Sequence, residues 1–237
     1  MRPTEPVVLI TGAAGPAGRA AAARFAATGA RLALAGRDGP RLAEIGAGLG
    51  LADDRWAAAV GDLRKPDGAG AVVAAALERF ARIDVLLHLV GGWTGGTPLT
   101  GLDSKVLRGM LDQHLWTTFN VARLVVPGMV ERGWGRVVAV SSPLAATPGA
   151  GMGAYGVAKA AEEALLGTLA REVAVTGVTV NVVVVRTIDA EHQREREPSP
   201  RNASHTTPEE LAQVLAYLAS DEAASVNGAR IPLFGRG

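Results

Sequence analysis

Short, uninterrupted runs of apolar residues alternate along this chain with longer stretches that are rich in Ala. A strand that is apolar at every position is buried on both faces, which is typical of a parallel sheet covered by helices. Repeated strand–helix units of this kind build a doubly wound fold. The sequence therefore predicts a Rossmann-type α/β fold, with a mainly parallel sheet of about seven strands and helices on both faces.

The same pattern locates the elements. Strands are expected at residues 7–10, 32–35, 57–60, 85–90, 137–140, 178–185 and 231–234. Helices are expected at residues 19–28, 41–49, 69–81, 103–132, 155–176 and 208–220. Thr206 and Thr207 are candidate N-caps of the last helix, and a bend is expected near Pro127. No linker separates two domains, so a single domain over residues 1–237 is expected.

Composition argues against several classes of function. The absence of Cys excludes disulfides, thiol catalysis and thiolate metal sites, and no metal site is expected. A net charge of +1 argues against nucleic-acid binding. No apolar run approaches the roughly 18 residues of a membrane span, and the N-terminus shows no secretory signal. We therefore expect a cytoplasmic protein without nucleic-acid or membrane partners.

A Gly-rich turn at residues 11–18 connects the first predicted strand to the first helix. The N–H groups and the positive end of a helix at such a turn attract phosphate, and glycines let the backbone approach a pyrophosphate closely. Glycines alone are weak evidence for a dinucleotide site, but their position between the first strand and the first helix makes the evidence stronger. The alternative is an ordinary turn that binds no ligand. The Gly-rich turn predicts a dinucleotide site at Gly12, Gly15, Ala17 and Gly18.

Two further strand ends carry candidate cofactor contacts. The second strand ends in Gly36-Arg37-Asp38, and the Arg37 guanidinium is suited to a phosphate, which favours NADP (NADPH) over NAD. Asp38 could instead pair with Arg37 or bind a ribose hydroxyl. Asp62 ends the third strand and could accept a hydrogen bond from the adenine amine or cap a short turn.

Lys and Tyr are rare in this chain, yet one of each stands four residues apart. Lys occurs three times, so 21 of the 24 basic residues are Arg, and there are two Tyr. Tyr155 and Lys159 share one face of a predicted helix, and Ser142 follows the fifth strand at the edge where open α/β sheets bind ligands. A nearby ammonium lowers the pKa of a phenol, so Tyr155 could exchange a proton with a substrate oxygen that Ser142 also hydrogen-bonds. Judged by its i,i+4 spacing alone, a Tyr–Lys pair is more often an exposed pair on a helix surface.

In this order, the motifs resemble those of the short-chain dehydrogenase/reductase family over nearly the whole chain. The matching segments are Thr11-Gly12 with Gly18, Asp62, Asp84-Val85-Leu86 before Gly91, Gly135-Arg136-Val137-Val138 before Ser141-Ser142, Tyr155 with Lys159, Val180-Asn181-Val182, and Leu218-Ala219-Ser220-Asp221 before Asn227-Gly228.

The resemblance implies a dinucleotide-binding and catalytic domain that transfers hydride between NADP(H) and a carbonyl or alcohol substrate. Tyr155 is then the general acid/base, Lys159 lowers its pKa and binds the nicotinamide ribose, and Ser142 polarises the substrate carbonyl. The resemblance also implies a homo-oligomer, a dimer or tetramer, formed through the helices at 103–132 and 155–176. Further cofactor contacts are expected at Leu63, Val90, Gly91 and Ile188.

Four departures from the family pattern raise their own hypotheses. Pro16 replaces a glycine of the nucleotide turn; it lacks an N–H group but suits the first turn of a helix. His88 fits a satisfied core histidine better than a chemical role, whereas His114 replaces a relay Asn and either fills its space or carries protons to Tyr155 through Lys159. Val185 and Arg186 replace Pro-Gly. Arg186 fits an exposed residue among nearby glutamates better than a contact to the diphosphate or an acidic substrate.

The substrate side and the class of reaction are less constrained. Trp93, in the Gly-rich loop at residues 91–96, could stack on a flat substrate or pack under its own loop. Residues 186–207 are charged and interrupted by Pro, which fits a mobile substrate loop or a solvated connection. With Leu144, Pro148 and Met152, these residues would give an apolar wall suited to a ketone or a cyclic substrate.

Two other classes of function stay open. One is a non-redox lyase or dehydratase on the same scaffold, which the altered nucleotide turn keeps in consideration. The other is a dinucleotide-binding protein without turnover, against which the retention of Ser142, Tyr155 and Lys159 argues.

Overall fold

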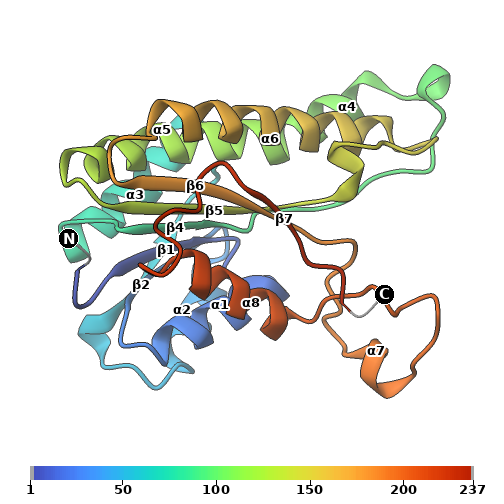
Figure 1. Cartoon of the computed structure of the whole chain (residues 1–237). Helices are drawn as coiled ribbons and strands as arrows, with labels where there is room; N and C mark the ends of the chain where they lie inside the picture. Colours follow the sequence, from blue (N-terminus) through green and yellow to red (C-terminus); the bar gives the residue numbers. More distant parts are fainter. Residues whose placement is uncertain (1–2, 236–237) are drawn as a thin grey trace.

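A parallel sheet of seven strands forms the centre of the computed structural model, which describes residues 3–235 (Figure 1). Each pair of neighbouring strands is parallel. The strands, in their order across the sheet, are β3 (Trp56–Val60), β2 (Arg31–Gly36), β1 (Val7–Thr11), β4 (Val85–His88), β5 (Gly135–Ser141), β6 (Val178–Val184) and β7 (Arg230–Pro232). The predicted doubly wound fold is confirmed.

Helices cover both faces of the sheet (Figure 1). One face packs against α1 (Pro16–Ala26), α2 (Gly39–Ala47) and α8 (Pro208–Leu218). The other face packs against α3 (Pro66–Phe80), α5 (Thr117–Glu131) and α6 (Gly153–Glu172). The central strands are therefore buried on both sides, and every residue of β1 and β6 is buried, including the polar Thr11, Thr179 and Asn181.

Several helices begin at or next to a proline, a signal that the apolar pattern does not include. Pro16 and Pro66 open α1 and α3, and Pro40 lies in the first turn of α2, so all three helices begin before the predicted positions. Pro suits the first helical turn because its missing N–H would have no helical partner there. At α8, Thr207 is the N-cap and forms a capping box with Glu210.

The long helix expected at residues 103–132 consists of three consecutive segments. These are α4 (Ser104–Leu111), a π-helical turn η3 (Asp112–Trp116) and α5, which contains Pro127. A π-turn inserts one extra residue into a helix and is frequent at functional sites. The sequence pattern did not predict this turn, and His114 lies within it.

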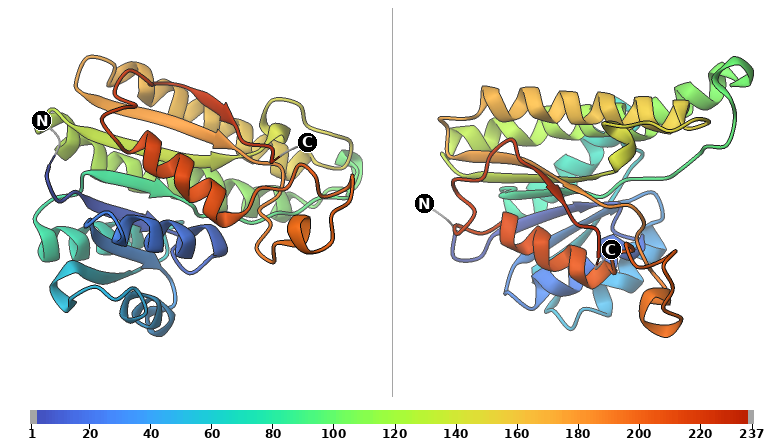
Figure 2. Two further views of the ribbon diagram at one scale, coloured as in Figure 1. Left: turned by 60° about the horizontal axis from the view of Figure 1, so that its bottom comes forward. Right: turned by 45° about the vertical axis from the view of Figure 1, so that its right-hand side comes forward.

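The segments that follow the carboxyl ends of β4 and β6 project beyond the same end of the sheet (Figure 2). After β4, the chain passes through the short 3₁₀ turn η2 (Leu99–Gly101) to α4, and after β6 it forms the short helix α7 (Gln193–Arg196). The Asp189 carboxylate accepts hydrogen bonds from the Gln193 and Arg194 N–H groups, and Arg194 pairs with Glu210 at 2.6 Å. The segment at residues 186–207 therefore has internal contacts and is tied to α8.

Two further 3₁₀ turns complete the elements, η1 (Asp53–Arg55) before β3 and η4 (Pro143–Ala145) after β5. Among residues 3–235, the structure contains no helix with the length and apolar character of a membrane span.

Asp84 connects the start of β1 to the start of β4. Its fully buried carboxylate accepts a hydrogen bond from the Val7 N–H at 2.9 Å and pairs with Arg82 at 2.7 Å. We predict that Asp84→Ala lowers the free energy of unfolding by about 3 kcal/mol, because the substitution leaves a buried N–H without an acceptor and removes a buried ion-pair partner. Urea denaturation measures the loss, and Asp54→Ala, at an exposed carboxylate, is the matched control. A loss for Asp84→Ala no larger than that of the control contradicts this role.

Candidate active site

Two hollows join at the edge of the sheet where the carboxyl ends of the strands meet. The β2 hollow, of about 400 Å³, lies over the ends of β1, β2 and β3. The β5 hollow, of about 570 Å³, lies beside the ends of β5 and β6 and the start of α6. Both are lined by Gly12, Gly15 and residues 89–91, so they form one continuous crevice. Strand order reverses between β1 and β4, which is where open α/β sheets bind ligands.

Every catalytic and cofactor-binding residue predicted from the sequence lines this crevice, whereas Pro148 and Met152, which were expected in the substrate wall, do not line it. In the β2 hollow are Gly12, Gly15, Arg37, Asp62, Leu63, Val90 and Gly91. In the β5 hollow are Gly12, Gly15, Ala17, Gly18, Val90, Gly91, His114, Ser142, Tyr155, Lys159 and Ile188.

The Gly-rich turn allows close backbone approach at the junction of the two hollows. Gly12 has a positive φ of 70°, and a Cβ atom there would lie 2.6 Å from the Leu89 carbonyl oxygen. A Cβ on Gly18 would lie 2.4 Å from the Gly12 carbonyl oxygen. Side chains at these two positions would therefore clash with backbone, which explains the glycines.

The first turn of α1 can hold a phosphate without help from a side chain. Pro16 is at the start of the helix, and Gly15 is an N-cap without a side-chain hydrogen bond. The N–H groups of Ala17 and Gly18 belong to the first turn, where backbone donors have no acceptor inside the helix. They are available to an anion at the positive end of the helix, so the turn fits a dinucleotide phosphate although Pro16 contributes no donor.

At the far end of the β2 hollow, the acidic residues already have partners. The Asp38 side chain accepts a hydrogen bond from the Arg41 N–H and caps α2, an arrangement that neither sequence interpretation of Asp38 included. Asp62 pairs with Arg64 at 2.7 Å and accepts a hydrogen bond from the Arg64 N–H, so it does cap a short turn. The hydrogen bond from the Arg64 side chain lowers the pKa of Asp62 to about 2. Arg37 is exposed and lines the hollow.

The β5 hollow brings Ser142, Tyr155 and Lys159 together. Ser142 follows β5, and its Oγ accepts a hydrogen bond from the Leu144 N–H at 3.3 Å, so the hydroxyl proton is available to another acceptor. Tyr155 is partly exposed, and Lys159 lies one turn further along α6. Lys159 is only 3% exposed, so the alternative of a surface pair is wrong.

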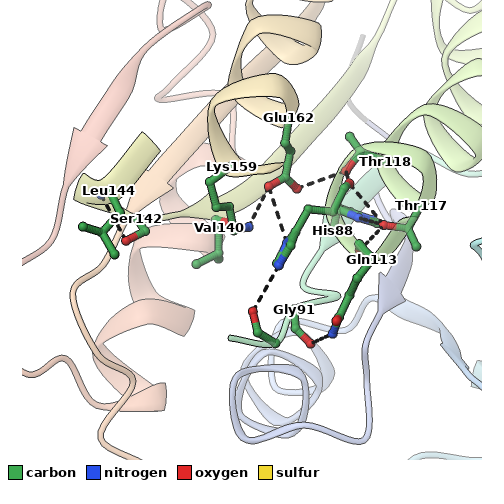
Figure 3. Close-up of polar contacts among 12 residues, drawn as sticks. His88, Gly91, Gln113, Thr117, Thr118, Val140, Ser142, Leu144, Lys159 and Glu162 are labelled. Carbon is green, nitrogen blue, oxygen red and sulfur yellow. Dashed lines mark hydrogen bonds and ion pairs between the residues drawn. The ribbon is translucent and has the colours of Figure 1, made fainter. Parts of the chain in front are cut away.

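Two hydrogen bonds fix the Lys159 ammonium (Figure 3). Its Nζ donates to the Val140 carbonyl oxygen at 2.7 Å and to Glu162 Oε2 at 2.6 Å. Glu162 is 1% exposed and also accepts a hydrogen bond from Thr118 at 3.0 Å. The sequence analysis missed Glu162. Its spacing of three residues from Lys159 on one helix was the available signal.

The two buried histidines differ in their surroundings. His88 bonds to Thr11 and Thr117 through its two ring nitrogens, which confirms the expected satisfied core histidine. His114 is fully buried in the wall of the β5 hollow, its Nε2 lies 3.1 Å from the Gly92 carbonyl oxygen, and its ring meets Tyr155 edge-on at 5.5 Å. Burial lowers the pKa of each histidine to about 3, so both are neutral.

The outer wall of the β5 hollow combines aromatic, apolar and basic residues. Trp93 is 60% exposed and lines the hollow, which argues against packing under its own loop. Leu144 and Ile188 also line it. Arg186 is exposed, as expected, and its guanidinium lies over the Phe234 ring, 4.9 Å from its centroid. Since a cation stacks well on an aromatic face, Phe234 holds this charge at the hollow.

Comparison with known proteins gives a consistent result. The model of the short chain dehydrogenase family matches residues 6–201. A 1,6-dihydroxycyclohexa-2,4-diene-1-carboxylate dehydrogenase of Pseudomonas putida is 32% identical over 250 residues, covering 97% of this chain and 91% of the relative. The reductase FabG of Vibrio cholerae, which acts on 3-oxoacyl-acyl-carrier-protein by its name, is 29% identical over 233 residues, covering 94% and 93%.

A solved structure of levodione reductase superimposes with a TM-score of 0.87 at 28% identity, covering 99% of this chain and 98% of that one. The family model spans most of the chain, and the dehydrogenase relative exceeds 30% identity over nearly its whole length. The chain therefore belongs to the short-chain dehydrogenase/reductase family of oxidoreductases.

Proposed function

We propose that the protein is an NADP(H)-dependent ketoreductase or alcohol dehydrogenase with Tyr155 as the general acid/base. The observation that carries the proposal is that Ser142, Tyr155 and Lys159 line one hollow that opens directly into the crevice beside the Gly-rich turn. A crevice of this size and polarity suits an extended dinucleotide with a substrate at one end. When bound, the nicotinamide would supply or accept the hydride.

The side chains of the β5 hollow are suited to the proton half of the reaction. In reduction, the Tyr155 hydroxyl donates its proton to the substrate oxygen, and the Ser142 hydroxyl donates a hydrogen bond to the same oxygen. In oxidation, the phenolate removes the proton from the alcohol. Lys159, one helical turn further along α6, supplies a buried ammonium in the same hollow, and a nearby positive charge stabilises a phenolate.

The proposed preference for NADP(H) rests on the β2 hollow. Arg37 is exposed there, whereas Asp38 is engaged in capping α2 and Asp62 is paired with Arg64. The Arg37 guanidinium is therefore available to a ligand at the end of β2, and a guanidinium pairs well with a phosphate. The Ala17 and Gly18 N–H groups would bind the diphosphate.

We further propose a ketone or a secondary alcohol on an apolar or cyclic skeleton as the substrate. Trp93, Leu144 and Ile188 give the β5 hollow an apolar wall, and Trp93 offers a flat face for stacking. The dehydrogenase relative has a cyclohexadiene in its name, and another relative is named as a 3-oxoacyl reductase. Residues 186–188 border the hollow, so residues 186–207 are proposed as the substrate loop.

A homo-oligomer is proposed from the outer surface of the helices at residues 104–131 and of α6. Large apolar side chains that are 37–49% exposed lie there, which is typical of an interface between copies of a chain. These side chains are Trp116, Phe119, Leu124 and Val157.

Tyr155→Phe is expected to lower kcat/KM for ketone reduction about 10³-fold, because the phenyl ring has no proton to donate. NADPH binding should persist, since the substitution removes a single hydroxyl. Steady-state kinetics and fluorescence titration with NADPH measure the two effects. Tyr217→Phe, at the half-exposed Tyr on α8, is the matched control and should leave both unchanged. Retained activity in Tyr155→Phe would exclude Tyr155 as the acid.

Arg37→Asp is expected to weaken NADPH binding about 30-fold and to leave NADH binding nearly unchanged, because only NADPH carries the 2′-phosphate. Calorimetry with each cofactor measures the ratio. Arg24→Asp, in the last turn of α1 away from the crevice, makes the same change in charge and is the control. Equal losses for both cofactors contradict the role of Arg37. NADPH binding without hydride transfer to any of a panel of ketones would instead favour the non-redox or binding-only alternatives.

A further inference from the structure

Glu162 is a buried carboxyl group that the proposed chemistry does not explain. It lies on α6 one turn after Lys159, next to both Lys159 and Thr118, and its side chain is 1% exposed (Figure 3). Removing a carboxylate from water costs free energy, and pairing it with a buried cation recovers little net stability. Glu162 contacts Lys159 and lies beside His114, so its contribution is expected in the site and not in the stability of the fold.

The hydrogen bonds around Glu162 allow two protonation states. Thr118 Oγ1 lies 2.7 Å from the His114 carbonyl oxygen and 3.0 Å from Glu162 Oε1. A hydroxyl carries one proton, so Thr118 can donate to only one of these oxygens at a time. If Thr118 donates to the carbonyl oxygen, Oε1 must carry its own proton to bond with Thr118. If Thr118 donates to Oε1, the carboxylate is ionised.

His114 adds a second proton acceptor beside the same carboxyl group. Its Nε2 faces the Gly92 carbonyl oxygen, which only accepts, so Nε2 carries the ring proton and Nδ1 is the bare nitrogen. Nδ1 is buried, makes no hydrogen bond among residues 3–235, and lies 4.0 Å from Glu162 Oε2. His114 Nδ1 and Glu162 Oε2 are thus two acceptors that face each other, and Lys159 donates a hydrogen bond to Glu162 Oε2.

We propose that Glu162 is a positioning residue that holds the Lys159 ammonium in the wall of the site and, by gaining or losing one proton, sets the net charge beside Tyr155. The inference rests on the proposed function, in which Tyr155 is the acid/base. With Glu162 ionised, the Lys159–Glu162 pair is neutral. With Glu162 protonated, the pair carries a positive charge and stabilises the phenolate more strongly.

The charged and titratable groups around Glu162 come from four elements. On α6 are Lys159, Tyr155 and Glu163, and on η3 is His114. Glu163 is itself paired with Arg230 of β7 at 2.9 Å, which balances its charge. Beyond His114 lies His88 of β4, and both histidines are neutral. Burial raises the pKa of Glu162, although Lys159 and Thr118 act in the opposite direction.

Glu162→Gln tests the proposal because the amide reproduces the protonated state. Its oxygen can still accept from Lys159, and its NH₂ group can donate to Thr118 Oγ1, so the geometry is retained while the negative charge is lost. Without that charge the phenolate is favoured. We therefore expect Tyr155 to titrate about one pH unit lower than with Glu162 in place.

The chain offers a direct readout that needs neither cofactor nor turnover. It contains two Tyr, so Tyr217→Phe leaves Tyr155 as the only group that gives a tyrosinate absorbance. The protein with Tyr217→Phe alone is compared with proteins that also carry Glu162→Gln or Glu163→Gln. The Glu162→Gln curve should lie about one pH unit lower. The Glu163→Gln control also leaves a partner cation unbalanced, but it should shift the curve far less, because the Arg230–Glu163 pair is partly exposed and screened by solvent whereas the Lys159–Glu162 pair is buried.

Circular dichroism shows whether each variant folds. A second variant, Thr118→Val, tests the proposal if Glu162→Gln does not fold. Thr118→Val keeps the carboxyl group but removes its hydroxyl partner, so it favours the protonated acid and should shift the Tyr155 titration the same way by a smaller amount. Unchanged titration in the folded Glu162→Gln protein, or in Thr118→Val if the former is unfolded, overturns the proposal. A shift to higher pH also overturns it, because Glu162 would then serve to keep Lys159 protonated. Loss of activity in Tyr155→Phe bears on the proposed function alone, since the titration does not depend on turnover.

Discussion

Parallel pairing of all seven strands is the constraint on which the rest of the structure depends. Two parallel neighbours cannot be joined by a hairpin, so each connection begins at a carboxyl end and returns along one face of the sheet through a helix. All the segments that leave those ends therefore gather at one edge. The Gly-rich turn after β1, Ser142 after β5 and residues 186–188 after β6 share the crevice for this reason, although they are far apart in sequence.

The elements with the strongest local signals were predictable from the sequence. All seven strands are rich in apolar residues or border an apolar run, and each lies within a few residues of its expected position. All fourteen predicted catalytic and cofactor-binding residues line the crevice, because most of them follow strand ends and a parallel sheet brings its strand ends together at one edge. The helix starts were predicted late because prolines in the first turns were not weighed.

The features that escaped prediction depend on contacts between elements. The π-turn at His114 leaves no apolar signature, because the surrounding helical pattern continues through it. Arg186 is exposed, as expected, but its contact with Phe234, near the end of the chain, has no signal among its neighbours in sequence. Glu162 looks like an ordinary i,i+3 partner of Lys159. Its burial follows from the packing of α6 on η3 and from the contact with Thr118 of α5, which the sequence does not show.

The balance of charge in this buried region follows from how few ionised groups it contains. Burial keeps His88 and His114 neutral, so the Lys159 ammonium is the one cation facing them among the described residues, and Glu162 is its carboxylate partner. An Arg could not replace Lys159 easily, because a planar guanidinium does not fit where a compact buried ammonium donates to both Val140 and Glu162. This explains why a chain that otherwise favours Arg keeps Lys here. In a region with one cation and one acid, a single proton on Glu162 changes the net charge from zero to one, and a neighbouring phenol responds to that change more strongly than it would in water.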